Sequence, residues 1–215
     1  MTLNLRIEEQ KYGQQTVIKN IEYPFEKGSL YGLVGKNGQG KTTFFKCILG
    51  LVKYKGNTEF KGHKLNISEV AWCPTEPHVY GELTSSEFKE FYAELLEIEK
   101  TDEKDLFEIP QNKLIKEFST GMKKKIYLNA IFQKDFQIYL LDEPFNGLDI
   151  ESNYRLTNYL KEKVKNGIVI ISSHILDSLY SICESILLIQ DTKLKEFKKT
   201  EFDEIERILF KMDEK

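Results

Sequence analysis

The chain of 215 residues contains few cysteines and no long apolar run. Its three cysteines, Cys47, Cys73 and Cys183, lie far apart and form no C-x-x-C pair, which argues against a disulfide framework or a cysteine-rich zinc site. The most apolar runs, 168–171 and 186–189, are far shorter than the roughly 18 residues that a membrane-spanning helix needs. The N-terminus also lacks the basic-then-apolar order of a signal peptide. We therefore expect a soluble, globular protein of the cytosol.

The chain also lacks a marked excess of charge of either sign. Its 31 Lys and Arg residues against 34 Asp and Glu give a net charge of −3, which argues against a generic nucleic-acid binder, so we expect no nucleic-acid partner. The three histidines, His63, His78 and His174, are too scattered for a metal cluster. With 40% hydrophobic residues the chain can bury a proper core. Its length fits one domain over residues 1–215, without an appended regulatory domain.

Strands and helices alternate along the chain. Alternating apolar and polar residues predict a half-buried strand at 2–8, and further strands are expected at 16–23 and 30–34, before a helix at 41–51. Because strands and helices alternate again in the last third, we expect a mostly parallel sheet. The elements predicted there are a strand at 137–141, a helix at 151–165, a strand at 167–172, a helix at 175–183, a strand at 185–190 and a charged helix from 200 onward.

The middle of the chain has a different pattern. Thr84 and Glu87 form a capping box, in which a hydroxyl and a carboxylate satisfy the first amides of a helix. A charged stretch at 97–104 and Pro110 mark loops and short helices. We therefore expect a helical subdomain at about 77–133, inserted in an α/β body. The helix after Thr84 is predicted to carry one apolar face formed by Phe88, Phe91, Tyr92, Leu95 and Leu96.

The strongest local signal is the glycine-rich stretch 35–42, which fits the phosphate-loop pattern G-x-x-x-x-G-K-[ST]. An apolar strand precedes it and a helix follows, which is the context that the pattern requires and which disfavours a chance glycine-rich turn. Glycines let backbone N–H groups converge on phosphate oxygens, and the helix N-terminus adds partial positive charge. We expect Lys41 to reach the β- and γ-phosphates and the Thr42 hydroxyl to ligate Mg²⁺.

A second polar feature follows an apolar run at 136–141, which ends in Asp142 and Glu143. A buried strand with this ending would present both carboxylates at the ligand edge of a parallel sheet. Asp142 would then hold Mg²⁺, and Glu143 could polarise an attacking water. In isolation these residues would be interpreted as a solvated acidic turn, and the upstream phosphate loop favours the catalytic interpretation.

The chain contains five motifs, at 35–43, 118–123, 140–144, 146–149 and 172–174. They stand in the order found in the ATP-binding cassette (ABC) ATPases, and the chain resembles this family from Tyr12 to about Gln190. The resemblance implies an α/β fold: a P-loop NTPase core with a mostly parallel sheet, an N-terminal antiparallel β part and the inserted helical subdomain. The segment 80–84 with Glu87 is similar to the drug, antibiotic and lantibiotic exporter branch.

The resemblance also implies roles for single residues. Glu143, His174 and Lys41 would be catalytic, with Glu143 as the general base and His174 touching the γ-phosphate. Ser119 and Gly121 match the family signature, which contacts ATP held by a second protomer. The expected nucleotide-binding residues are Tyr12, which would stack on adenine, together with Gly35, Asn37, Gly38, Gly40, Lys41, Thr42, Thr43, Ser119, Gly121 and Asp149; Thr42 and Asp142 would be the metal ligands.

Outside the family, several of these residues have simpler interpretations. Tyr12 would be an ordinary turn tyrosine, His174 a surface or capping residue, and Ser119 the cap of a solvated helix. One departure from the family matters: Thr75 occupies the position of a glutamine that touches Mg²⁺ and the attacking water. Threonine is shorter by two heavy atoms, so we expect a water-mediated or absent metal contact and slow turnover. Glu76 is a candidate to compensate.

The resemblance implies an ATP-binding and ATP-hydrolysing subunit that powers a membrane ABC exporter through ATP-dependent dimerisation. The partners would be a transmembrane permease on a separate chain and a second protomer, with the chain peripheral on the cytoplasmic face of the membrane. The alternatives are a soluble ABC ATPase of an assembly machine and a slow or degenerate nucleotide sensor. The permease would dock near 75–95, where Tyr80, Leu83, Phe88 and Phe91 are either contacts or simply core residues.

Overall fold

The computed structural model describes residues 1–98 and 105–210, so most of the charged stretch predicted at 97–104 lies outside the described residues. Its strands are β1 (Thr2–Tyr12), β2 (Gln15–Glu26), β3 (Leu30–Val34), β4 (Lys55–Phe60), β5 (His63–Lys64), β6 (Val70–Cys73), β7 (Ile138–Asp142), β8 (Ile168–Ser172), β9 (Ser185–Gln190) and β10 (Lys193–Lys198). The helices are α1 (Lys41–Ile48), α2 (Ser85–Leu95), α3 (Thr120–Ile131), α4 (Ile150–Val164), α5 (Leu176–Tyr180) and α6 (Phe202–Phe210), with 3₁₀ turns at Ile67–Glu69, Ile115–Glu117 and Lys199–Glu201.

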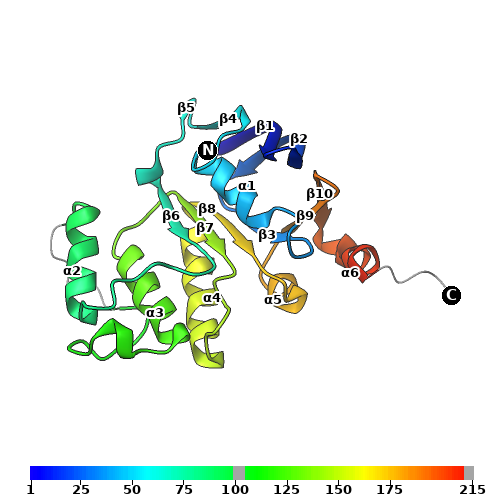
Figure 1. The fold of residues 1–215 in the computed structure, drawn as a ribbon. Helices are drawn as coiled ribbons and strands as arrows, with labels where there is room; N and C mark the ends of the chain where they lie inside the picture. Colours follow the sequence, from blue (N-terminus) through cyan, green and yellow to red (C-terminus); the bar gives the residue numbers. More distant parts are fainter. Residues whose placement is uncertain (99–104, 211–215) are drawn as a thin grey trace.

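A six-stranded sheet organises the molecule, with the strand order β10-β9-β3-β8-β7-β6 (Figure 1). Its neighbours pair in parallel except for β10, which is antiparallel to β9. The prediction of a mostly parallel sheet is therefore confirmed. Because β3, β7 and β8 run in the same direction, the segments that follow their carboxyl ends meet at one edge of the sheet. Those segments contain the phosphate loop, Glu143 and His174.

Both faces of this sheet are buried, and successive residues of a strand face different cores. In β7, Ile138 and Leu140 pack in the core that also contains Phe44 and Phe45 of α1, while Leu141 packs in the core that contains Leu156 of α4. Burial on both sides explains why β7, β8 and β9 are continuous apolar runs rather than alternating ones. The strand tips are thus held rigidly at the edge where the motifs lie.

The N-terminal strands form a separate antiparallel sheet with the order β2-β1-β4-β5. Leu3, Leu5 and Ile7 are buried as their alternation predicts, and they pack toward α1 in the same core as Phe44. Figure 1 shows this sheet on the side of α1 away from α4. The antiparallel β part implied by the family resemblance is present.

The helices between β6 and β7 pack beside the parallel sheet, with α2 at the outer side of α3 (Figure 1). The predicted capping box is confirmed, since Thr84 Oγ1 accepts from the N–H of Glu87, whose carboxylate accepts from the N–H of Thr84. Phe88 is fully buried, but Phe91 is 39% exposed and Leu95 is 62% exposed. The predicted apolar face is therefore only partly covered, because the stripe is wider than the surface that α2 packs on α3.

Two further details differ from the sequence expectations. The predicted helix at 175–183 is shorter, because α5 ends at Tyr180 and the chain turns before β9. The strand β10 lies in a stretch that shows no strand signal in the sequence. Within residues 1–98 and 105–210, no helix is long and apolar enough to cross a membrane. The boundaries of the helical subdomain at 77–133 stay a prediction.

Candidate active site

The phosphate loop connects β3 to α1, and two of its glycines have no room for a side chain. A Cβ on Gly35 would lie 2.7 Å from the carbonyl oxygen of Ile189. Gly40 has φ +105, in the left-handed region, and its Cβ would lie 2.8 Å from Cγ1 of Val17. Close packing and backbone geometry therefore both require glycine here.

The N-terminus of α1 is open to an anion. Gly40 provides no side-chain cap, and the first turn contains no acidic residue. The first amides of α1 consequently point at the adjoining cavity with partial positive charge and without a carboxylate to neutralise them. Lys41 is largely buried, and its Nζ donates to the carbonyl oxygen of Gly35 at 2.8 Å. A phosphate group at this helix end would compete with that carbonyl for the ammonium group.

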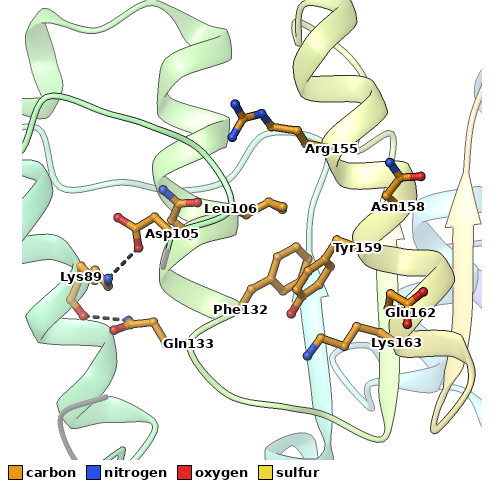
Figure 2. Close-up of a pocket in the computed structure, with 11 residues that line it drawn as sticks. Lys89, Asp105, Leu106, Phe132, Gln133, Arg155, Asn158, Tyr159, Glu162 and Lys163 are labelled. Carbon is orange, nitrogen blue, oxygen red and sulfur yellow. Dashed lines mark hydrogen bonds and ion pairs between the residues drawn. The ribbon is translucent and has the colours of Figure 1, made fainter. Parts of the chain in front are cut away.

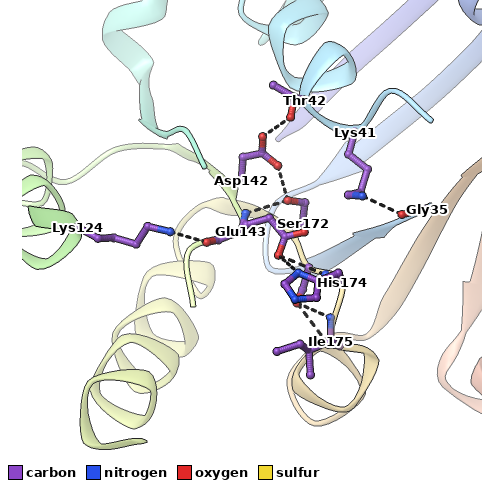
Figure 3. A network of polar contacts seen from close by, with 10 residues as sticks. Gly35, Lys41, Thr42, Lys124, Asp142, Glu143, Ser172, His174 and Ile175 are labelled. Atoms are coloured by element: carbon purple, nitrogen blue, oxygen red, sulfur yellow. Dashed lines mark hydrogen bonds and ion pairs between the residues drawn. The ribbon is translucent and has the colours of Figure 1, made fainter. Parts of the chain in front are cut away.

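Asp142 connects the phosphate loop to the strand tips. Its Oδ2 accepts from the Thr42 hydroxyl at 2.5 Å, and its Oδ1 accepts a short hydrogen bond from the Ser172 hydroxyl (Figure 3). The carboxylate is buried, and Thr42 stands 100 residues earlier in the chain. The sheet topology alone explains this meeting, because β3 and β7 both end at this edge.

Glu143 follows β7 with a left-handed backbone at φ +52, which is uncommon for a residue other than glycine. Its N–H donates to Ser172 Oγ at 2.9 Å. Its Oε2 lies 2.9 Å from Nδ1 of His174 and also accepts the N–H of His174 at 3.3 Å. Figure 3 shows the carboxylate directed at the half-exposed imidazole. Glu143, the expected base, is therefore paired with His174, the residue expected to contact the γ-phosphate.

A cavity of about 470 Å³ brings most of the predicted site residues together. It contains residues of the phosphate loop, the tip of β7, the segment after β6 and His174, so four separate parts of the sequence meet there. Asn146, which had no role in the sequence prediction, also lines it. The lining residues are Asn37, Gly38, Gly40, Lys41, Thr42, Thr43, Thr75, Asp142, Glu143, Asn146 and His174.

Five predicted nucleotide-binding residues do not line this cavity. Gly35 lies at the start of the phosphate loop and packs against the backbone of Ile189. Tyr12 is half-exposed at the end of β1. Ser119 caps α3 by accepting from the N–H of Met122, and a Cβ on Gly121 would lie 2.1 Å from the carbonyl oxygen of Gly147. Asp149 caps α4 through the N–H of Ser152.

Asp149 is also held by α3, because its Oδ2 accepts from Lys125 Nζ at 2.5 Å. The lysine and the cap hold the pKa of Asp149 well below its usual range. The signature helix and Asp149 are thus joined within one chain, outside the cavity.

A larger cavity, of about 570 Å³, lies among α2, α3 and α4 and contains none of the motif residues (Figure 2). Phe132 and Tyr159 stack in it with ring centroids 4.5 Å apart. Its cationic groups already have acidic partners: Lys89 pairs with Asp105, Arg155 with Glu151, and Lys163 with Asp135. With these charges neutralised locally, the cavity offers little positive potential to an anionic ligand.

Comparison with known proteins now identifies the family. The profile of the family described as ABC transporter matches residues 18–146. The chain is 32% identical over 192 residues to the SkfA peptide export ATP-binding protein SkfE of Bacillus subtilis (strain 168), covering 82% of this chain and 80% of that protein. The chain belongs to the ABC transporter family. Members of this ABC ATPase family bind and hydrolyse ATP, and so the protein is an ATPase that powers a transporter.

Further matches agree with this family and fold. The ABC ATPase is 31% identical over 201 residues to the bacitracin transport ATP-binding protein BcrA of Bacillus licheniformis, covering 86% of this chain and 65% of that protein. A solved structure of an ATP-binding subunit of an ABC transporter superposes with a TM-score of 0.84 at 25% identity, covering 100% of this chain and 95% of that chain. The soluble assembly ATPase and the degenerate sensor are not favoured, because the matched proteins are transporter subunits.

Besides Asn146, two residues of this ABC ATPase site had no role in the sequence prediction. Ser172 joins Asp142 to the backbone of Glu143, and Lys124 donates from Nζ to the carbonyl oxygen of Glu143 at 2.7 Å. Ser172 stands at the end of a predicted strand beside His174, so its place in the motif was a usable signal. Lys124 is the middle residue of three consecutive lysines, and the sequence alone does not distinguish it from its neighbours.

Thr75 lines the phosphate cavity of the ABC ATPase, whereas Glu76 is exposed and does not line it. Glu76 is therefore not positioned to compensate for the missing glutamine. We expect Thr75→Gln to raise the rate of ATP hydrolysis by about fivefold, which is what one added hydrogen bond of about 1 kcal/mol supplies, and to lower the Mg²⁺ concentration needed for half-maximal activity.

Phosphate release measured against Mg²⁺ concentration checks this expectation. Thr75→Asn is the matched control, because it adds an amide that is one methylene shorter and should leave the rate near that of the wild type. An unchanged rate and Mg²⁺ dependence in Thr75→Gln would count against the assignment of this position.

Proposed function

We propose that the chain hydrolyses Mg·ATP in the cavity between the phosphate loop and the tip of β7, and that this hydrolysis powers export through a membrane permease. The observation that carries the proposal is the meeting of an uncapped helix N-terminus, a buried lysine and two carboxylates at one sheet edge. A polyphosphate needs the first two, and water attack on it needs a base. The match to a peptide export protein and to a bacitracin transport protein supports export.

The donor set at Thr42 and Asp142 suits Mg²⁺. It consists of one hydroxyl and one carboxylate oxygen beside the expected phosphate position, both hard oxygen ligands. Within the described residues, no group of three or more His, Cys, Asp or Glu side chains could hold a metal ion by itself. This agrees with a cation that is bound by one carboxylate and completed by the phosphates of the substrate. When bound, Mg²⁺ would neutralise charge on the β- and γ-phosphates.

The chain's own residues would perform the remaining steps. Lys41 would exchange the Gly35 carbonyl for phosphate oxygens, while the first amides of α1 surround the same group. His174 would release Glu143 and donate to the γ-phosphate, because a phosphate oxygen is a charged acceptor at the mouth of the cavity. Glu143 would then be free to accept a proton from the attacking water.

A second copy of the chain would complete each site. Ser119 and Gly121 lie outside the cavity of their own chain, on the surface where α3 meets the segment 146–149. This placement supports a role toward nucleotide bound by another protomer. Tyr12 is exposed enough to stack on adenine at the end of β1. The γ-phosphate would bridge the two chains, and its hydrolysis would remove that bridge.

The permease would dock on three exposed side chains that lie on α2 or just before it. We call them the α2 patch: Tyr80, Phe91 and Leu95. Tyr80 is 47% exposed, and its ring meets that of Phe91 edge-on at 5.5 Å. Phe88 is fully buried and Leu83 packs partly buried against the core, so both belong to the core rather than to this surface. An exposed aromatic and aliphatic cluster of this kind is suited to a protein partner. Docking here would place the chain on the cytoplasmic face of the membrane.

Charged substitutions in the α2 patch should release the chain from membranes. We expect Phe91→Glu combined with Leu95→Glu to lower the membrane-bound fraction by about tenfold, since buried apolar contacts contribute about 1.5–3 kcal/mol each. The measurement is sedimentation of membranes from cells that express the chain with its own permease. Ile67→Glu, which changes a comparably exposed apolar residue on the 3₁₀ turn Ile67–Glu69, away from α2, is the control. Equal membrane binding by the patch variant and the wild type would contradict the docking proposal.

A further inference from the structure

Lys124 is a buried lysine on the signature helix α3. It is 3% exposed, and its Nζ donates to the carbonyl oxygen of Glu143 at 2.7 Å (Figure 3). Lys123 and Lys125 on either side of it are only partly buried. Of the three consecutive lysines, only Lys124 is buried, and its ammonium group contacts the backbone of Glu143, the expected base.

Packing alone does not account for a charged group at this position. Burial is the largest influence on Lys124 and lowers its pKa, and the nearby charges of Glu143 and Asp142 oppose that effect. The neighbouring Cys73 is a neutral thiol at pH 7, because burial raises its pKa to about 12. An apolar side chain of similar length would fill the same space without desolvating a charge. The contact between its Nζ and the carbonyl oxygen of Glu143 is therefore the feature that accounts for a lysine here.

The contact fixes the backbone of Glu143 in an uncommon conformation. With φ +52, Glu143 needs both of its neighbouring peptide groups to be held. The Ser172 hydroxyl accepts its N–H at 2.9 Å, and Lys124 donates to its carbonyl oxygen. These two bonds set the direction in which the side chain leaves the strand. The carboxylate consequently faces His174 and the phosphate cavity.

The same helix holds the far end of the segment 143–149. Lys125 pairs with Asp149, and Gly121 lies directly against the carbonyl of Gly147. Tyr127, three residues after Lys124, donates from its hydroxyl to the carbonyl oxygen of Trp72 at 3.1 Å, so α3 is also tied to β6. A movement of the N-terminus of α3 would therefore act on the backbone of Glu143.

We propose that Lys124 is a positioning residue for ATP hydrolysis, which holds the backbone of Glu143 so that its carboxylate faces the γ-phosphate. When the ATP of a second protomer binds to Ser119 and Gly121, Lys124 transmits this contact to Glu143. The inference rests on the proposed function, because it assigns Lys124 to the same site. In each chain, Lys124 would thus connect the site of that chain's own nucleotide with the signature residues that contact the partner's nucleotide.

The test removes the ammonium group and keeps the length of the side chain. Lys124→Met should lower kcat by about 10- to 100-fold while the Kd for ATP changes by less than about threefold, because the base is displaced and the phosphate loop is untouched. Lys124→Arg, which keeps charge and donors, should recover most of the loss. Lys161→Met, an exposed lysine of α4, is the matched control and should behave as the wild type.

A second background separates positioning from a structural role. If Lys124 acts through Glu143, Lys124→Met should lower the single-turnover rate of a Glu143→Gln chain by less than about twofold. Equal losses in both backgrounds, a parallel loss of ATP binding, or a kcat within about twofold of wild type would overturn the proposal. If Lys124→Met does not fold in thermal melts, Lys124→Gln, whose donor is one atom shorter, replaces it with the same expectations. Failure of the proposed function itself gives a different result: the wild type would release no phosphate, or Glu143→Gln would match it.

Discussion

Replacing Glu143 by glutamine is expected to lower the rate of ATP hydrolysis by about 10²- to 10⁴-fold, the range that a positioned general base contributes. Glutamine has nearly the same shape, so the amide can stay beside His174, but it cannot accept the proton of the attacking water. The left-handed backbone at Glu143 and its contacts with Ser172 and Lys124 are main-chain features that the substitution leaves in place. ATP binding should therefore change by less than about threefold.

The comparison needs a matched acid-to-amide control outside the cavity. Glu76→Gln provides it, since Glu76 is exposed and close in sequence to Thr75 but does not line the cavity. Phosphate release and equilibrium ATP binding are measured for both variants, with light scattering to follow the molar mass. We expect the Glu143 variant alone to accumulate as an ATP-bound dimer. Wild-type turnover in Glu143→Gln would contradict its assignment as the base.

Replacing Lys41 by methionine is expected to weaken ATP binding by about 100-fold or more, because charge-assisted hydrogen bonds contribute about 1.5–3 kcal/mol each and the ammonium group can reach two phosphates. The ammonium group of Lys41 is kept at the phosphate loop by the hydrogen bond from its Nζ to the Gly35 carbonyl. Methionine keeps the aliphatic stem, so the packing at the start of α1 is preserved. The loss should appear directly as a higher Kd for ATP, which is measured independently of turnover.

Lys46→Met is the control for this second prediction, since Lys46 lies in the last turn of the same helix and does not line the cavity. Isothermal titration with ATP gives the two dissociation constants, and thermal unfolding shows whether each variant is folded. A Kd for Lys41→Met within about threefold of the wild type would contradict the proposed phosphate site.

The sequence was sufficient for the central part of the site because its geometry follows from strand order. Thr42 and Asp142 meet since β3 and β7 are parallel strands of one sheet, and the apolar runs before both motifs predict those strands. The glycine pattern at 35–42 specifies its own backbone, as Gly35 and Gly40 show. Local chemistry and sheet topology point to the same edge, so no long-range information was needed.

Other features depend on packing that leaves no local signal. Three consecutive lysines look alike in the sequence, and only the packing of α3 beside β6 and Glu143 buries Lys124. The pairing of Glu143 with His174 joins two loops 31 residues apart. The hairpin into β10 turns at Asp191 and Thr192, both with positive φ, without the glycine that usually marks such a turn. The apolar stripe of α2 likewise does not show which part α3 covers.

The claim that two copies of this chain hydrolyse Mg·ATP at sites built from the phosphate loop, Glu143 and His174 is tested most directly by phosphate release from the purified wild-type protein. Glu143→Gln and Lys41→Met, prepared in the same way, serve as blanks. We expect sustained, Mg²⁺-dependent release whose rate per chain rises with protein concentration, because in the proposed arrangement a second chain completes each site. Absence of release at every concentration, or release that persists unchanged in both variants, would contradict the claim.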